Sequence, residues 1–123
     1  MRLRSDGLSR KDRSMFKLAA KMAVKSDCQI RHGAVVVRGG SILGLGFNRK
    51  IDGATSEPYT VHAEVDALNN VDGLVDGATM YVVRIYADDT YALSLPCESC
   101  YNTMNLYGIK KVVFSDCQAN QKM

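Results

Sequence analysis

Residues 30–47 read IRHGAVVVRGGSILGLGF, and this stretch decides the fold of the chain. Ile30 to Arg38 is rich in β-branched residues, and Ser41 to Phe47 alternates large apolar residues with small ones, so both segments predict β-strands. Gly39 and Gly40 stand between them, and glycine adopts the positive φ that a two-residue turn requires. The stretch therefore predicts a β-hairpin.

Further elements are predicted on both sides of the hairpin. Ser9 and Asp12 have the spacing of a capping box, and the apolar residues after them recur at helical intervals, which predicts a helix over residues 9–27. Residues 48–61 are predicted to form a loop, since they contain Gly53, Ser56 and Pro58. The rest of the chain predicts a helix from His62 to Asn70, a strand from Ala78 to Tyr86, a loop from Ala87 to Leu95, a helix that starts at Pro96 and is capped by Gly108, and a strand from Lys110 to Ser115.

This order of elements predicts an α/β fold. Its mixed central sheet has at least four strands, and because crossover helices join the later strands, we expect helices on both faces. The chain has 123 residues, 46% of them hydrophobic, which suffices for one core and leaves no room for a second. We therefore expect residues 1–123 to form a single domain.

The cysteines and the first residues indicate a cytoplasmic protein. The opening segment, MRLRSD, begins no apolar signal-peptide core, and the longest apolar run, Gly33 to Val37, is far shorter than the roughly 20 residues of a membrane-spanning helix. In a reducing compartment, the four cysteines indicate a metal or catalysis rather than disulfides. No membrane partner is expected.

Positive charge is concentrated at the start of the chain. The net charge is +3, and residues 1–25 carry eight Lys or Arg against Asp6 and Asp12. Such a segment could attract a polyanion. The simpler interpretation is that Lys17, Lys21 and Lys25, at four-residue spacing, form the solvent face of an amphipathic helix.

Two separate segments supply residues suited to a metal site. Cys97 and Cys100 are three positions apart in the first turn of a predicted helix, so their sulfur atoms project from one face, and the free N–H groups of that turn favour thiolates. His62 would occupy the matching position at the start of the preceding helix. One imidazole and two thiolates suit Zn²⁺, so we expect one zinc ion per chain, held by His62, Cys97 and Cys100.

Three protein ligands leave the fourth tetrahedral position of zinc for a water molecule. Zinc lowers the pKa of such a water to about 7, and an open position therefore indicates catalysis. Glu64 follows His62 by two residues and points to another side of an ideal helix, so it is poorly placed as a ligand but could reach the water. We expect Glu64 to be the catalytic residue that moves protons.

His62-Ala63-Glu64 and Pro96-Cys97-Glu98-Ser99-Cys100 together resemble the signature of the cytidine and deoxycytidylate deaminase superfamily. The segments 32–37, 46–48 and 108–113 also resemble the hairpin and the late strand of that family, in the family's order. The resemblance implies a three-layer cytidine-deaminase-like fold and zinc-dependent hydrolytic deamination. It also implies that Ala63 and Cys97 contact the substrate base through their backbone and that Asn48 binds the sugar or the base.

The metal site and Asn48 also have simpler interpretations. A structural zinc site would need a fourth protein ligand, for which Cys28, Cys117 and His32 are the candidates. Otherwise the two cysteines are predicted to be small core residues and His32 to be an ordinary hydrogen-bonded histidine. Asn48 could simply be a polar residue that ends a strand.

The chain departs from the family's pattern at several positions. Leu95 stands where many relatives carry glutamate, and the loop over 87–95 is longer than the link typical of adenosine deaminases that act on transfer RNA. Asp66 stands where deoxycytidylate deaminases often have asparagine. Residues 48–62 lack the additional cysteine and histidine residues that hold a second zinc in many of those enzymes.

A cytosine nucleotide, dCMP or CMP, is the first choice of substrate. Arg49 and Lys50 follow Asn48 and could reach a phosphate, although both could equally be exposed surface residues. A free nucleoside, cytidine or deoxycytidine, ranks second. A nucleic-acid substrate ranks third, because it would need a basic groove with aromatic platforms, of which the sequence gives no sign. A zinc-binding partner subunit without turnover is the non-enzyme alternative, and the intact Glu64 argues against it.

A homo-oligomer is also predicted. The last predicted strand runs directly into a polar tail over residues 116–123, so the additional elements that close the sheet in larger relatives are missing. An exposed sheet edge favours pairing with another subunit.

Overall fold

The computed structural model describes residues 1–51 and 60–117. Its elements are β1 (Arg2–Arg4), α1 (Arg10–Val24), β2 (Arg31–Arg38), β3 (Ser41–Phe47), β4 (Arg49–Lys50), β5 (Thr60–Val61), α2 (Ala63–Asn69), β6 (Thr79–Ile85), β7 (Tyr91–Ala92), α3 (Glu98–Leu106) and β8 (Lys111–Phe114). Gly53, Ser56 and Pro58, and the tail over residues 118–123, lie outside the described residues.

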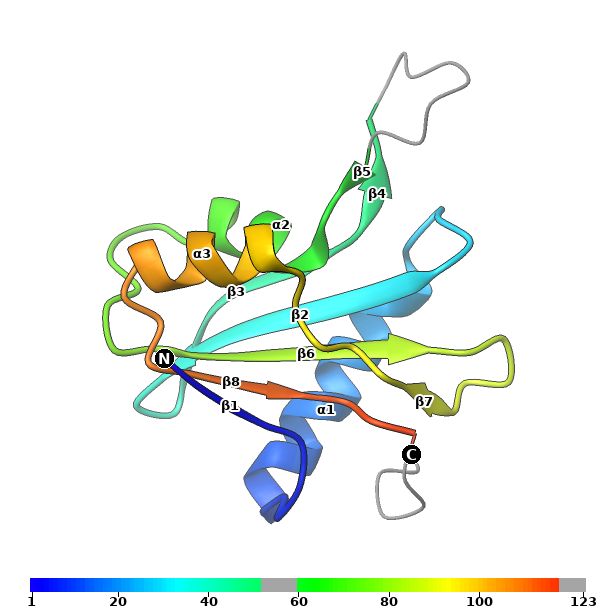
Figure 1. The fold of residues 1–123 in the computed structure, drawn as a ribbon, viewed down its shortest axis with the longest axis horizontal. Helices are drawn as coiled ribbons and strands as arrows, with labels where there is room; N and C mark the ends of the chain where they lie inside the picture. The colour runs from blue at the N-terminus through cyan, green and yellow to red at the C-terminus, as the bar shows by residue number, and fades with distance from the viewer. Residues whose placement is uncertain (52–59, 118–123) are drawn as a thin grey trace.

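A mixed sheet forms the middle of three layers (Figure 1). Its strand order is β1-β8-β6-β2-β3, with β7 added beside the end of β6. β8 runs parallel to β1 and β6, whereas β2 is antiparallel to both of its neighbours. α1 covers one face of the sheet, and α2 and α3 lie side by side on the other (Figure 1). The predicted α/β fold, with a mixed sheet and helices on both faces, is confirmed.

The central strands are apolar on both faces. Val82 and Val112 pack beneath α2 and α3, whereas their neighbours Val83 and Val113 pack against α1. A strand covered on both sides has no solvent face, which explains why these strands are continuous valine-rich runs rather than alternating ones. The hydrophobic core is therefore divided by the sheet into two layers.

The hairpin joins β2 to β3 as its glycines predict. Gly39 and Gly40 have φ values of +55° and +83°, the left-handed conformations that a tight hairpin turn needs. Two other glycines serve close packing. A Cβ at Gly33 would overlap the carbonyl oxygen of Ala19 in α1, and a Cβ at Gly46 would overlap the backbone N of Ala67 in α2. These glycines let one helix touch each face of the hairpin.

β1 is a strand that the sequence pattern does not predict. Arg2, Leu3 and Arg4 pair in parallel register with Lys111, Val112 and Val113 of β8. Three residues with two arginines carry no strand signature, so only tertiary pairing places them in the sheet. β1 covers the edge of β8 that the sequence predicts to be exposed. The edge of the sheet is therefore β1 rather than β8, and the homo-oligomer stays a prediction.

The predicted boundaries need smaller corrections. The predicted loop over 48–61 contains the paired strands β4 and β5, and the predicted loop over 87–95 contains β7. Ser9 and Asp12 form the capping box, but α1 ends at Val24, three residues before the predicted end. Pro96 precedes the N-cap of α3 instead of starting the helix. Backbone pairing between distant segments, which no local pattern encodes, accounts for the short strands.

Gly46→Ala is expected to lower the free energy of unfolding by about 1–3 kcal/mol, because the added methyl group must displace the backbone of α2. Equilibrium urea unfolding followed by circular dichroism measures the change. Gly39→Asn is the matched control. Its surroundings are open and asparagine tolerates a positive φ, so its cost should stay below about 1 kcal/mol. Equal destabilisation by the two variants would contradict the close packing at Gly46.

Candidate metal centre

Two helix starts meet above the sheet. His62 is the N-cap of α2 and Cys97 is the N-cap of α3, both with extended backbone (φ −72°, ψ 150° and φ −70°, ψ 165°). The Cys97 Sγ accepts a hydrogen bond from the backbone N–H of Cys100 at 3.5 Å. Since α2 and α3 lie side by side, the ends of these two helices bring residues from distant parts of the chain together (Figure 1).

The side chains of His62, Cys97 and Cys100 form a compact set of donor atoms. His62 Nδ1 is 3.1 Å from Cys100 Sγ and 3.7 Å from Cys97 Sγ, and all three donor atoms lie within 4.8 Å of one another. A tetrahedral zinc ion, with bonds of about 2.0 Å to nitrogen and 2.3 Å to sulfur, separates such ligands by about 3.5 Å. The spacing and the chemistry of the donors both fit zinc.

Within the described residues, the set of donor atoms has three members. Among residues 1–51 and 60–117, no other His, Cys, Asp or Glu joins the cluster. Cys28, Cys117 and His32, the candidates for a fourth structural ligand, all lie outside it. The arrangement is therefore that of an open site, which keeps one coordination position for water or substrate.

Glu64 and Cys100 are the two buried titratable groups at the site. Burial raises the pKa of Glu64 above its usual value, against the opposing effects of a hydrogen bond with its own backbone, of His62 and of a hydrogen bond with Cys100. Burial and then the negative charge of Glu64 raise the pKa of the Cys100 thiol. The helix start alone therefore does not favour the Cys100 thiolate, and a bound cation must supply that stabilisation.

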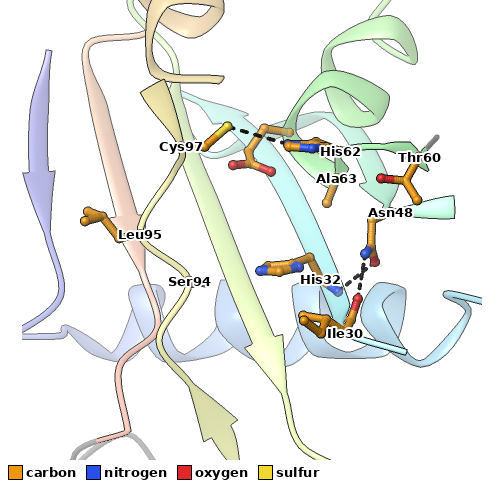
Figure 2. Close-up of a pocket in the computed structure, with 10 residues that line it drawn as sticks. Ile30, His32, Asn48, Thr60, His62, Ala63, Ser94, Leu95 and Cys97 are labelled. Atoms are coloured by element: carbon orange, nitrogen blue, oxygen red, sulfur yellow. Dashed lines mark hydrogen bonds between the residues drawn. The ribbon is translucent and has the colours of Figure 1, made fainter. Parts of the chain in front are cut away.

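A pocket of about 280 Å³ opens beside His62 and Cys97 (Figure 2). Its lining also includes Glu64, Asn48, Ile30 and Thr60. Ala63, His32, Ser94 and Leu95 complete the wall. The structure thus brings all the predicted site residues except the buried Cys100 to one cavity. Thr60, Ser94 and Leu95 are additional lining residues, and no local sequence signal marks them, because their places depend on the tertiary fold.

The Asn48 side chain is already engaged by the backbone. Its Oδ1 accepts a hydrogen bond from the His32 N–H at 2.8 Å, and its Nδ2 donates to the Ile30 carbonyl at 2.6 Å (Figure 2). These bonds fasten the start of β2 to the end of β3. An amide has two N–H groups and two acceptor lone pairs, so Asn48 keeps one of each for a ligand.

His32 is a pocket residue that the sequence interpretation undervalues. Its ring projects into the pocket, and within the described part of the chain no hydrogen bond to the ring is found (Figure 2). The prediction of an ordinary hydrogen-bonded histidine stays a prediction. Burial lowers the pKa of His32 to about 4, helped by the charges of Arg84 and His62, so the ring is neutral near pH 7. The alternation of side chains along β2 could have predicted this position, because it places His32 on the same face of the sheet as Ala34, beneath α2.

Arg49 does not stand free beside the pocket. Its Nη2 lies 3.2 Å from Asp66 Oδ1, and the other carboxylate oxygen of Asp66 accepts the backbone N–H of Phe47 at 3.1 Å. Asp66 thereby joins the first turn of α2 to the end of β3. The suggestion that Arg49 reaches a substrate phosphate loses its support, because the guanidinium already has a carboxylate partner.

The two remaining cysteines differ from their predicted place in the core. Cys117 is exposed, and Cys28 is only partly buried. Neither belongs to the metal centre. Within the described segments, no helix is long and apolar enough to cross a membrane.

The profile of the cytidine and deoxycytidylate deaminase zinc-binding region matches residues 9–116. The chain belongs to this family. The match spans the hairpin and both ligand-bearing helices, so the resemblance carried by residues 62–64 and 96–100 is confirmed. No curated protein sequence matches this deaminase-family chain.

Solved structures agree with membership of the deaminase family. A dCMP deaminase from the cyanophage S-TIM5 matches with a TM-score of 0.72 and 25% identity, over 89% of this chain and 86% of that one. A cytidine deaminase from Burkholderia pseudomallei matches with a TM-score of 0.68 and 21% identity, over 91% and 88%. A guanine deaminase from Bacillus subtilis matches at 0.58 and 19%, over 89% and 65%. The last two identities support the shared fold alone.

The wild-type protein is expected to bind one zinc ion per chain, measured by inductively coupled plasma mass spectrometry. Cys97→Ala and Cys100→Ala should each lose most of the metal, because two protein ligands hold zinc poorly. Cys117→Ala, an exposed cysteine outside the cluster, is the matched control and should keep it. Glu64→Gln should also keep it. Zinc loss in Glu64→Gln would show that the glutamate is a ligand rather than a neighbour of the metal.

Proposed function

We propose that this protein hydrolyses the amino group of a cytosine nucleotide, dCMP or CMP, and releases the uracil nucleotide and ammonia. One observation carries the proposal: a cluster of three donor atoms, with no fourth in the described residues, adjoins a pocket that a buried glutamate also lines. Zinc bound by His62, Cys97 and Cys100 would supply a hydroxide nucleophile at neutral pH.

Glu64 is proposed to move the protons. Glu64 is only 6% exposed as a residue, and it lines the pocket two residues after the proposed ligand His62. We assign it two proton transfers: it passes one proton of the attacking water to the ring nitrogen of cytosine, and it then passes the proton of the newly formed hydroxyl to the departing amino group, so that the hydroxyl becomes the uracil carbonyl. The carbon–nitrogen bond breaks, and the nitrogen leaves as ammonia.

Other lining residues are proposed to hold the substrate. Ala63 is the first residue of α2, so its N–H has no helical partner and can donate to the base, and Cys97 is proposed to contact the base through its backbone. Asn48 offers its remaining N–H and acceptor to the sugar. The ring of His32 also lines the pocket and can bind the base or the sugar. A pocket of about 280 Å³ suits a base and a sugar, and leaves a phosphate at its mouth.

Arg84 replaces Arg49 as our candidate for binding the phosphate. It pairs in register with His32 across β2 and β6, so its side chain lies on the pocket's face of the sheet. Its guanidinium carbon is 5.6 Å from the centre of the Tyr86 ring, and it forms no ion pair with the residues described here. An arginine without a counter-ion beside the pocket favours a nucleotide over a nucleoside.

We further propose that the protein acts in the cytoplasm as a homo-oligomer, a proposal that rests on the sequence.

The zinc-loaded protein is expected to release ammonia from dCMP or CMP, and Glu64→Gln should lower kcat by about 10²–10⁴-fold, because it removes the group that transfers protons. A coupled ammonia assay measures both. Adenosine and cytosine-containing oligonucleotides complete the substrate panel. Absence of ammonia from every substrate, with zinc bound, would overturn the proposed function.

Arg84→Gln is expected to lower kcat/KM for dCMP by about 10–100-fold and to leave deoxycytidine within about twofold, because a charged hydrogen bond to the phosphate is lost. Steady-state kinetics measures the ratio of kcat/KM for dCMP to kcat/KM for deoxycytidine. Arg49→Gln is the matched control and should leave this ratio unchanged. If Arg49→Gln changed this ratio and Arg84→Gln did not, Arg49 rather than Arg84 would be the residue that binds the phosphate.

A further inference from the structure

One end of the α1 face of the sheet is not covered by helix. α1 packs on Tyr81 and Val113, but the row two residues earlier on these strands lines an open hollow beside the first residues of α1. That row contains Arg2, Lys111 and Thr79, which are in register on β1, β8 and β6. Because alternate residues share a face, Lys111 points to the same side as Val113. The uncovered end of this face is therefore basic.

Arg2 and Lys111 stand directly opposite each other on neighbouring strands. Like charges in such positions destabilise a sheet. Neither side chain forms an ion pair or a hydrogen bond within residues 1–51 and 60–117. The pair therefore carries an electrostatic cost that an anionic ligand would relieve.

Two adjoining hollows of about 680 and 460 Å³ extend this basic surface, and they share Arg4 and Lys111 in their walls. Their cationic lining residues, here called the basic cleft, are Arg2, Arg4, Lys11, Arg38, Lys110 and Lys111. The acidic lining residues are Asp6 and Asp12. Positive charge therefore exceeds negative charge along the whole cleft.

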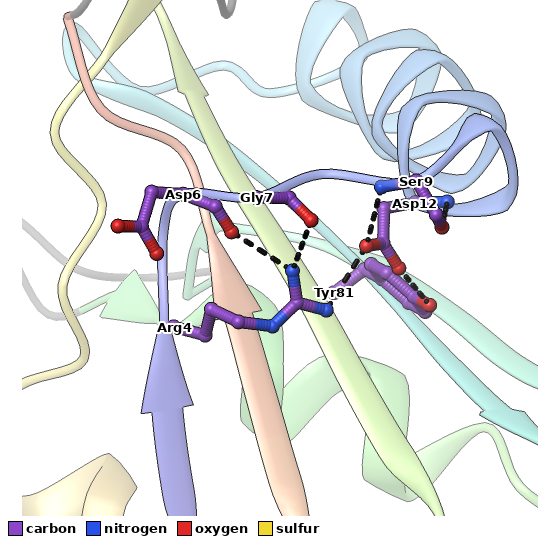
Figure 3. A network of polar contacts seen from close by, with 6 residues as sticks. All are labelled: Arg4, Asp6, Gly7, Ser9, Asp12 and Tyr81. Carbon is purple, nitrogen blue, oxygen red and sulfur yellow. Dashed lines mark hydrogen bonds and ion pairs between the residues drawn. The ribbon is translucent and has the colours of Figure 1, made fainter.

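Arg4 neutralises Asp12 and fixes the wall of the cleft (Figure 3). Its guanidinium donates to the carbonyls of Asp6 and Gly7 at 2.9 and 3.0 Å and to Asp12 Oδ2 at 3.0 Å. Tyr81 donates its hydroxyl to the other oxygen of Asp12 at 2.8 Å. Burial alone would raise the pKa of Asp12, but these bonds and that from the Ser9 N–H lower it. The buried carboxylate is thus already balanced within the protein.

The other five cations lack an acidic partner in the described part of the chain. Lys11 and Lys110 are exposed and form no ion pair, and Arg38 donates only to the carbonyls of Leu74 and Asp76. Five cations without an ion-pair partner, against the single carboxylate of Asp6, exceed what a single phosphate group needs. They match an extended polyanion with several phosphates.

We propose that the basic cleft binds the phosphate backbone of a nucleic acid without reading its sequence. Sequence-tolerant stacking on single strands uses exposed aromatic rings. Tyr81, one of two aromatic residues that line the cleft, is only 3% exposed and is bonded to Asp12. The other, Phe114, is partly buried. Charge is therefore the main contribution that the cleft offers.

The basic cleft is distinct from the substrate pocket. Its smaller hollow is lined by the first residues of α1 and by Tyr81 on the α1 face of the sheet, and its larger hollow lies at the edge strand β1. The donor atoms lie at the starts of α2 and α3, and neither Arg4 nor Lys111, which line both hollows, lines the substrate pocket. A bound strand would hold the protein on nucleic acid without presenting a base to Glu64. The inference goes beyond the proposed function and does not depend on it. The basic N-terminal segment is therefore divided between two surfaces. Lys11 lines the cleft, whereas Lys17 and Lys21 are exposed on α1 away from it.

The test is fluorescence anisotropy of a labelled oligothymidylate of about 20 nucleotides, titrated with the zinc-loaded full chain between about 50 and 200 mM KCl. Oligothymidylate contains no cytosine, so the substrate pocket does not bind it as a substrate. We expect the logarithm of affinity to fall linearly with that of salt, by about 0.7 for each phosphate contacted.

The variant Lys11→Ala with Lys110→Ala removes two charges from the cleft. It should weaken binding at least about tenfold and make the salt slope less steep by about 1.4. Lys17→Ala with Lys21→Ala removes the same charge from the exposed side of α1, and its affinity should stay within about twofold. All four lysines are exposed, so both variants should keep the thermal unfolding midpoint of the wild type.

Three results would overturn the proposal. The first is no salt-dependent binding by the wild type. The second is an equal loss in the two lysine variants, which would indicate diffuse attraction by net charge. The third is displacement of the oligonucleotide by tripolyphosphate at a matched phosphate concentration, which would indicate a small polyphosphate site instead of a backbone site.

Discussion

The contact between α2 and β3 is the constraint on which the metal centre depends. His62 is the N-cap of α2, while Cys97 and Cys100 belong to the start of α3, so the three donor atoms meet only when both helices sit at the right height on one face of the sheet. Gly46 allows α2 to approach the hairpin backbone closely. Asp66 reinforces this position by accepting the N–H of Phe47. Close packing at Gly46 and the hydrogen bond of Asp66 therefore both fix the first turn of α2, and this turn fixes the position of His62.

Features that are local in sequence could be predicted. Gly39 and Gly40 set the hairpin turn, and Ser9 with Asp12 starts α1, because each signal depends on residues only a few positions apart. The donor set was also predictable from spacing and side-chain chemistry. Helix N-termini place ligands at known positions, so His62 and Cys97 indicated the site before any tertiary contact was known.

Features that depend on distant contacts could not be predicted. β1 becomes a strand only because β8 pairs with it, and Arg49 is paired with Asp66, a residue 17 positions away. The engaged amide of Asn48 and the place of His32 in the pocket follow from how the hairpin ends fold against each other. The basic cleft likewise combines Lys110 and Lys111 with an N-terminal segment about a hundred residues earlier. The sequence shows where positive charge is concentrated along the chain. Only the strand order of the sheet shows which residues surround that charge in the fold.

The central claim is that the metal centre has three protein ligands and one open position. Zinc K-edge X-ray absorption on the purified protein tests it most directly. The account predicts two sulfur atoms at about 2.3 Å and two nitrogen or oxygen atoms at about 2.0 Å, with one of the latter replaced when a competing anion is added. Four protein ligands with no exchangeable one, or a shell without two sulfur atoms, would contradict it.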